Sequence, residues 1–133
     1  MPIKGFTHVS LSVTDLERSL AFYRDLLGLG VFVDRFDGSA FEGEEVMLLA
    51  GRTVLCLQAH AANDGERFDP THSGLDHLAF TVESMDELEQ LGRALDAAGI
   101  RHSGIRPITH FGHLIEVRDP DGIQVELHVP PRP

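Results

Sequence analysis

Alternating apolar and polar residues mark a strand near the start of the chain and a second strand in its middle. Residues 5–13 read Gly-Phe-Thr-His-Val-Ser-Leu-Ser-Val, and residues 74–82 read Gly-Leu-Asp-His-Leu-Ala-Phe-Thr-Val. Both segments alternate with the period of two that is typical of a strand with one buried face. Because the segments also match each other in order and residue type, they predict a structural unit that occurs twice.

A predicted helix follows each of these strands. Two tetrads, Thr14-Asp15-Leu16-Glu17 and Ser84-Met85-Asp86-Glu87, have the capping-box form that satisfies free N–H groups at a helix start. Apolar residues then recur at helical spacing. They are Leu16, Leu20, Tyr23 and Leu27 in the first helix, and Leu88, Leu91 and Leu95 in the second. Each pattern stops at a glycine, Gly28 or Gly99, which suits the left-handed position after a helix end.

Three strand-like stretches follow each helix. They cover residues 31–36, 45–50 and 53–59 in the first half, and 100–105, 112–118 and 123–129 in the second half. The polar segment 61–73 contains glycine and proline and is predicted to link the halves. The fold class is therefore predicted as α+β. One domain over residues 1–133 would hold two βαβββ modules in tandem, residues 5–60 and 74–129, forming a cupped, barrel-like mixed sheet with helices outside.

Four of the strands share one distribution of side chains. One face is aliphatic and is expected to pack under the helices. The other face combines small residues with isolated polar ones, which favours the wall of a cavity over a solvated surface. The residues of this second face are His8, Ser10, Ser12, Cys56, Gln58, His60, His77, Ala79, Thr81, Gln124, Glu126 and His128.

Three of these residues predict a metal site. His8 and His77 occupy the same position of the repeat, and Glu126 lies on the corresponding face of the last strand. Two imidazoles and one carboxylate leave positions open on a metal for substrate or water, and they suit one divalent ion of Fe, Mn, Zn, Ni or Co. The alternative is a pair of hydrogen-bonded strand histidines with a solvated glutamate. A single histidine would favour that alternative, whereas the repeated position and the matching carboxylate favour the metal.

Composition narrows the range of partners. The net charge of −10 disfavours nucleic acid, and no apolar run reaches the roughly 20 residues that span a membrane. The strand pattern begins at once, so no signal peptide is expected. The single cysteine excludes an intrachain disulfide. We expect a cytoplasmic protein with a small-molecule substrate, no nucleic-acid or membrane partner, and a homodimeric assembly through its open sheet edges.

Three segments carry a resemblance to a known family. They are Thr7–Val13 with Asp15 and Phe22-Tyr23 after it, Gly74–Phe80, and the turn and strand of Asp119–Leu127. In order and spacing they resemble the vicinal oxygen chelate superfamily, which includes glyoxalase, extradiol dioxygenases, fosfomycin-resistance transferases, methylmalonyl-CoA epimerase and bleomycin-binding proteins. The resemblance implies paired βαβββ modules, a divalent metal and a substrate chelated through adjacent oxygens.

The implied function is a metal-dependent enzyme acting on a small oxygen-rich molecule, as a lyase, an isomerase or a ring-cleaving oxygenase. One alternative is a metal-dependent thiol transferase of the fosfomycin-resistance type, although those enzymes need a basic cluster that the sequence does not display. The other is a drug- or metabolite-binding resistance protein without catalysis. Relatives of that last kind lack the ligand triad, so the triad favours an enzyme.

Two positions depart from the resemblance. Cys56 stands where a glyoxalase carries a fourth, carboxylate ligand, which leaves a three-ligand site with Cys56 or Gln58 as candidates for a fourth. Glu116 stands where dioxygenases and fosfomycin transferases tend to carry a tyrosine. We predict that Glu116 is a catalytic general base; the alternative is a strand glutamate that pairs with Arg106 or Arg118.

Residues one strand repeat away from a ligand, or from its equivalent in the other half, are predicted to contact the substrate. They are Ser10, Gln58, Ala79 and Gln124.

Overall fold

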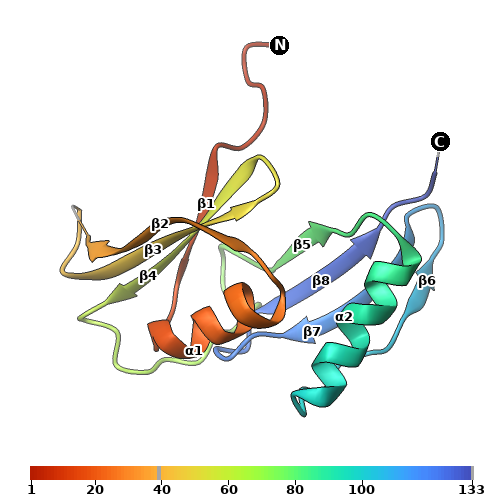
Figure 1. The fold of residues 1–133 in the computed structure, drawn as a ribbon. Helices are drawn as coiled ribbons and strands as arrows, with labels where there is room; N and C mark the ends of the chain where they lie inside the picture. The colour runs from red at the N-terminus through yellow and green to blue at the C-terminus, as the bar shows by residue number, and fades with distance from the viewer. Residues whose placement is uncertain (39, 133) are drawn as a thin grey trace. The chain divides into compact units, whose positions relative to one another are not determined.

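Each half of the chain forms its own four-stranded mixed sheet with a helical segment (Figure 1). The structure is a computed structural model that describes residues 1–38 and 40–132. The chain divides into two compact units, unit 1 from Met1 to Glu66 and unit 2 from Arg67 onward.

Unit 1 contains β1 (His8–Ser12), α1 (Leu16–Leu20), the π-helical segment η1 (Ala21–Leu26), β2 (Gly30–Asp37), β3 (Gly43–Ala50) and β4 (Thr53–His60). Its strand order is β1-β4-β3-β2, with β1 parallel to β4 and the other pairs antiparallel. Helix α1 packs against β4. The core beneath it is aliphatic and aromatic, and includes Leu11, Leu20, Tyr23, Val46, Leu48, Leu55 and Leu57.

Unit 2 contains β5 (His77–Thr81), α2 (Met85–Ala97), β6 (Arg106–Ile108), β7 (Gly112–Arg118) and β8 (Gln124–Val129). Its strand order is β5-β8-β7-β6, and β5 is parallel to β8. Helix α2 packs on β7 and β8, and a Cβ added at Gly92 would lie 3.3 Å from the Ile115 side chain. The core of unit 2 includes Leu88, Leu95, Ile115, Val117, Val125 and Leu127. In the part of the chain that the structure describes, no helix is long and apolar enough to cross a membrane.

The two sheets have the same topology, which confirms the predicted tandem βαβββ modules. Within residues 1–38 and 40–132, strand pairing stays inside each unit, so each unit has its own open sheet. The predicted alternation of faces is also confirmed. In β8, Val125 and Leu127 are buried beneath α2, while Glu126 between them is partly exposed on the opposite face.

The first helix differs from its prediction in two respects. Its N-cap is Asp15, whose carboxylate accepts a hydrogen bond from the Arg18 N–H at 3.2 Å, so the cap lies one residue later than the capping-box pattern indicates. Its second half is π-helical, and the Leu27 N–H donates to the Phe22 carbonyl five residues back at 2.9 Å. This wider turn moves the buried stripe, so that Phe22 is buried and Leu27 is only half-buried.

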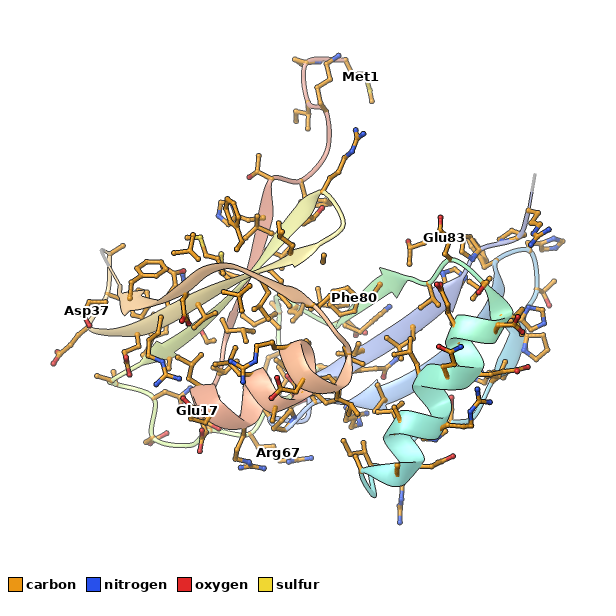
Figure 2. All side chains as sticks on the ribbon, viewed as in Figure 1. Met1, Glu17, Asp37, Arg67, Phe80 and Glu83 are labelled. Atoms are coloured by element: carbon orange, nitrogen blue, oxygen red, sulfur yellow. The ribbon has the colours of Figure 1, made fainter. Side chains whose placement is uncertain are left out.

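The second helix begins where the sequence predicts. The Ser84 hydroxyl accepts a hydrogen bond from the Glu87 N–H at 3.2 Å. The Glu87 carboxylate accepts a hydrogen bond from the N–H of Glu83, the residue before the cap, which is labelled in Figure 2. These two bonds satisfy N–H groups that would otherwise be left at the helix start.

The strand predicted for residues 100–105 is wrong. That segment makes one isolated bridge, between His102 and Val117, and the strand β6 begins only at Arg106. The reason is a turn at Gly104, whose φ of +71° belongs to the left-handed region. Pro107 is tolerated in β6 because this strand lies at the sheet edge, where a missing N–H disrupts no inner ladder.

Alanine substitutions at two glycines of unit 2, Gly104 and Gly112, test how closely the ends of β7 and β8 approach each other. Both have positive φ, but an added Cβ at Gly104 meets nothing within 4 Å, whereas at Gly112 it would lie 2.1 Å from the Val129 carbonyl oxygen. We expect Gly104→Ala to lower the free energy of unfolding by about 1 kcal/mol. Gly112→Ala should cost about 3 kcal/mol because the backbone must also move. Urea denaturation measures both, and equal losses would contradict the close approach.

Candidate metal site

His77 and Glu126 come together on the polar face of unit 2. Parallel pairing of β5 with β8 sets Ala79 opposite Glu126, and this places the His77 ring one step away on the same face. The His77 Nε2 atom lies 3.1 Å from a Glu126 carboxylate oxygen. The Glu126 side chain is 16% exposed and that of His77 is 41% exposed, so both reach solvent from a partly enclosed position.

Asp76 holds the other nitrogen of the His77 ring. Its carboxylate lies 2.7 Å from His77 Nδ1. A carboxylate at this position accepts the Nδ1–H, so Nε2, which faces Glu126, is the ring nitrogen left to bind a metal; this is the arrangement usual for metal-bound histidines. Asp76 was not predicted as a site residue, although its place directly before the repeated histidine was a signal.

Negative charge accumulates around the His77 ring. The hydrogen bond from Asp76 raises the pKa of His77 above its ordinary value, while partial burial acts against this rise. The charges of Glu126, Asp76 and Glu116 also raise that pKa. The same field that favours a proton on the imidazole favours a cation in its place.

His8 occupies the equivalent register position in unit 1. It pairs with Val54 of β4 as His77 pairs with Gln124 of β8. The Thr7 hydroxyl lies 3.0 Å from His8 Nδ1, so a side chain directly before the histidine again contacts this ring nitrogen. The structure thus brings His77 and Glu126 together within unit 2. The contribution of His8, which belongs to unit 1, stays a prediction from the repeat.

Unit 1 carries a thiol where unit 2 carries the carboxylate of Glu126, the predicted ligand. Cys56 pairs with Ser10 as Glu126 pairs with Ala79. Burial raises the pKa of the Cys56 thiol, which favours its neutral form over the thiolate that binds metals. The neighbouring candidate for a fourth ligand, Gln58, donates its amide N–H to the buried carboxylate of Glu45 at 2.9 Å.

Glu116 lies directly across from Glu126. The register of β7 and β8 pairs these two residues, so their side chains share the polar face. Glu116 forms an ion pair with Arg106, one of the two partners that the sequence analysis considered. Its backbone is tied to Ser103, because the Glu116 N–H donates to the Ser103 hydroxyl at 2.9 Å and the Ser103 N–H donates to the Glu116 carbonyl at 3.0 Å. The predicted role as a base stays a prediction.

A pocket of about 370 Å³ opens beside Glu116 in unit 2. Its lining comes from the segment before β6 and from β7 and β8, and consists of Arg101, His102, Ser103, Glu116, Val117, Arg118 and Gln124. Gln124 was predicted to contact a substrate. Arg101, His102 and Ser103 were not predicted as site residues, because their segment reads as a regular strand in the sequence.

The donor set on this face fits a divalent ion. An imidazole nitrogen and a carboxylate oxygen are ligands of Zn, Fe, Mn, Ni and Co. Two such ligands on one ion lie roughly 3 Å apart, because each bond is about 2.0–2.2 Å long. The 3.1 Å between His77 Nε2 and the Glu126 oxygen matches this separation. Within either unit, the described residues hold no cluster of three His, Cys, Asp or Glu side chains placed for a metal.

The chain belongs to the Glyoxalase/Bleomycin resistance protein/Dioxygenase superfamily, whose model matches residues 5–127. Glutathione transferase FosA of Serratia marcescens is 32% identical over 127 residues, which are 96% of this chain and 82% of that protein. Metallothiol transferase FosB of Staphylococcus saprophyticus is 30% identical over 127 residues, with 95% of this chain and 77% of that protein covered.

A solved structure of a glyoxylase/bleomycin resistance protein/dioxygenase domain from Frankia sp. agrees with this assignment. It is 33% identical, covers 97% of this chain and 99% of that chain, and superposes with a TM-score of 0.84. The family resemblance predicted from the three sequence segments is therefore confirmed.

The contact between Asp76 and His77 can be tested in metal-free protein. Asp76→Asn should lower the pKa of His77 toward about 6.5, because its largest raising cause is removed. Since the folded-state pKa is raised, the contact stabilises the protein below about pH 6.5 and its contribution fades as the pH rises through the His77 pKa. An NMR titration of the imidazole measures the shift, with Glu89→Gln on α2 as the control. An unchanged His77 pKa in Asp76→Asn would refute the contact.

Proposed function

We propose that the chain is a metal-dependent enzyme that binds one divalent ion through His8, His77 and Glu126. Its substrate would be a small oxygen-rich molecule that chelates the ion through adjacent oxygens. The observation that carries the proposal is the placement of His77 Nε2 against Glu126 with Asp76 behind the ring. Membership in a superfamily that includes metalloenzymes supports it.

A bound ion would supply Lewis acidity toward the chelated oxygens. The residues of the chain would then orient the substrate and move protons. Asp76 fixes the tautomer and the orientation of the His77 ring. Glu116 pairs with Glu126 across β7 and β8, and this shared face supports a role in which its carboxylate would take a proton from a substrate atom. Arg106 pairs with one carboxylate oxygen of Glu116, Oε1. We propose that the other oxygen, Oε2, accepts the proton from the substrate.

The substrate contacts proposed on the same faces come from both units. They are Ser10, Gln58, Ala79 and Gln124. The Gln58 amide N–H donates a hydrogen bond to Glu45, so the Gln58 carbonyl oxygen would accept one from a hydroxyl or N–H of the ligand. Ala79 lies between the His77 and Thr81 positions of β5 and opposite Glu126, so its small size would keep the space over the carboxylate open.

A thiol transferase is the second candidate function. It is favoured by the 32% identity to glutathione transferase FosA, because glutathione, which that name gives as the transferred group, is a thiol. A metal-free binding protein is the rival outside enzymes. Three assays of metal-loaded protein separate these functions: O₂ consumption with catechols for ring cleavage, loss of free thiol from glutathione with an epoxide for the transferase, and ligand binding without either for the binding protein.

Removal of any proposed ligand should weaken metal binding. We expect His8→Ala, His77→Ala and Glu126→Ala each to raise the dissociation constant for Zn²⁺ at least about a hundredfold. Even substitution of residues that are hydrogen-bonded to metal ligands lowers metal affinity by about 10–100-fold. Calorimetry on metal-free protein measures the constants. The control is His72→Ala, which removes a histidine that is exposed and paired only weakly with Asp69.

The same variants test the proposed homodimer. If one site takes ligands from two chains, mixing His8→Ala with Glu126→Ala chains should restore part of the Zn²⁺ binding. If a His8→Ala/His77→Ala double variant still bound one full equivalent of Zn²⁺, the proposed metal site would be contradicted.

Glu116 is expected to affect turnover and not metal affinity. Glu116→Gln keeps the shape of the side chain and removes the base, so turnover should fall about a hundredfold or more, in line with loss of a general base. The Zn²⁺ dissociation constant should stay within about threefold of wild type. Arg106→Gln, which breaks the ion pair and leaves the carboxylate, should retain most of the activity. If Glu116→Gln turns over as fast as wild type, Glu116 serves only its ion pair.

A further inference from the structure

We infer that the pocket beside Glu116 is an anion subsite in which Arg101 and Arg118 bind a carboxylate carried by the ligand at some distance from its chelating oxygens. The inference rests on the proposed function, because it places the subsite next to the proposed metal ligands on the polar face of unit 2. It adds the class of ligand, a molecule with two functional ends.

The first support is the position of Arg118 in the sheet. Register places His77, Gln124 and Arg118 in one row across β5, β8 and β7, and the next row holds Ala79, Glu126 and Glu116. Arg118 is thus two strands from His77, a backbone separation of about 9–10 Å at the usual strand spacing. A ligand group bound by Arg118 would then be a different group from the oxygens that meet His77 and Glu126.

The second support is the fixed orientation of the Arg118 guanidinium. Its Nη1 donates to the Gly122 carbonyl at 2.9 Å. Gly122 belongs to a turn held by the buried carboxylate of Asp119, which accepts the N–H groups of Asp121 and Ile123, each at 2.9 Å. Ordering the side chain in advance lowers the entropy lost when its remaining N–H groups bind an anion.

The third support is the balance of charge in the pocket. Arg101 and Arg118 are its cations and Glu116 is its carboxylate. Glu116 is already paired with Arg106, which lies outside the lining. Neither Arg101 nor Arg118 takes part in an ion pair found in residues 1–38 and 40–132. On a chain with a net charge of −10, such an excess of positive charge is what an anionic ligand would require.

The chemistry of the lining favours a carboxylate. A guanidinium binds a carboxylate through two parallel N–H···O bonds, and the Ser103 hydroxyl and the Gln124 amide are further polar groups of the wall. Because Arg118 stands two strands away from His77 in the register, we take this carboxylate to be a separate group from the chelating oxygens. The carboxylate would then belong either to the chelating substrate or to a second reactant such as a peptide thiol, and both sources share this chemistry.

Binding of glutarate, with the neutral glutaramide beside it, tests the subsite. We expect calorimetry on Zn²⁺-loaded protein to show glutarate binding that Arg118→Gln and Arg101→Gln each weaken at least about tenfold, as loss of a charge-assisted hydrogen bond does. Arg93→Gln on the exposed face of α2 makes the same change of charge and should leave the affinity within about twofold. Glutaramide should bind more weakly than glutarate by a similar factor.

A second arm with glutathione identifies the source of the carboxylate. Glutathione binding that falls in Arg118→Gln and Arg101→Gln assigns the subsite to a thiol reactant. A loss confined to glutarate assigns it to the chelating substrate, and both results support the subsite. Equal weakening in Arg93→Gln, or no weakening in Arg118→Gln and Arg101→Gln, overturns it.

Zn²⁺ affinity measured on the same samples separates this inference from the proposed function. If wild type binds Zn²⁺ through the proposed ligands but the glutarate affinity is unchanged in both arginine variants, only the anion subsite is refuted. If wild type binds no Zn²⁺ while the glutarate affinity still depends on Arg118, the proposed metal site is refuted and the anion subsite is supported.

Discussion

The parallel pairing of the first and last strands of each module determines what this protein can do. In unit 2, pairing of β5 with β8 brings His77 beside Glu126 from positions far apart in the sequence. The aliphatic residues on the opposite face fix this register, because a slip by one residue would turn Val125 and Leu127 to solvent and bury Glu126. The hydrophobic core beneath α2 therefore sets the geometry of the polar face above it.

The same constraint explains how one repeat yields two different halves. Unit 1 repeats the β1–β4 pairing and the contact to the histidine Nδ1, through Thr7 in place of Asp76. It carries the buried thiol of Cys56 where unit 2 carries Glu126. The aliphatic faces are alike because both modules bury them, whereas the polar faces have diverged. Unit 2 thus concentrates the charge, with Asp76, Glu126 and Glu116 around one imidazole.

Sequence patterns predicted the parts of the structure that depend on periodicity. Alternation and the repeat account for the strands other than β6, for the second helix with its Ser84 cap, and for the shared face of His77 and Glu126. The π-helical turn after Leu20 and the turn at Gly104 were not predictable in this way, because both depend on packing and backbone conformation. Arg101 and Arg118 escaped notice as a pair for a related reason: one lies in an irregular segment, and their proximity is set by the fold.

The most direct test of the central claim is an NMR titration of metal-free protein with Zn²⁺, observed through the side-chain nitrogens of its histidines. We expect saturation at one equivalent, with the Nε2 resonances of His77 and His8 moving to metal-bound values. The Nδ1–H of His77 should stay hydrogen-bonded to Asp76. Saturation at one equivalent with His77 and His8 unaffected, or no binding at all, would contradict it.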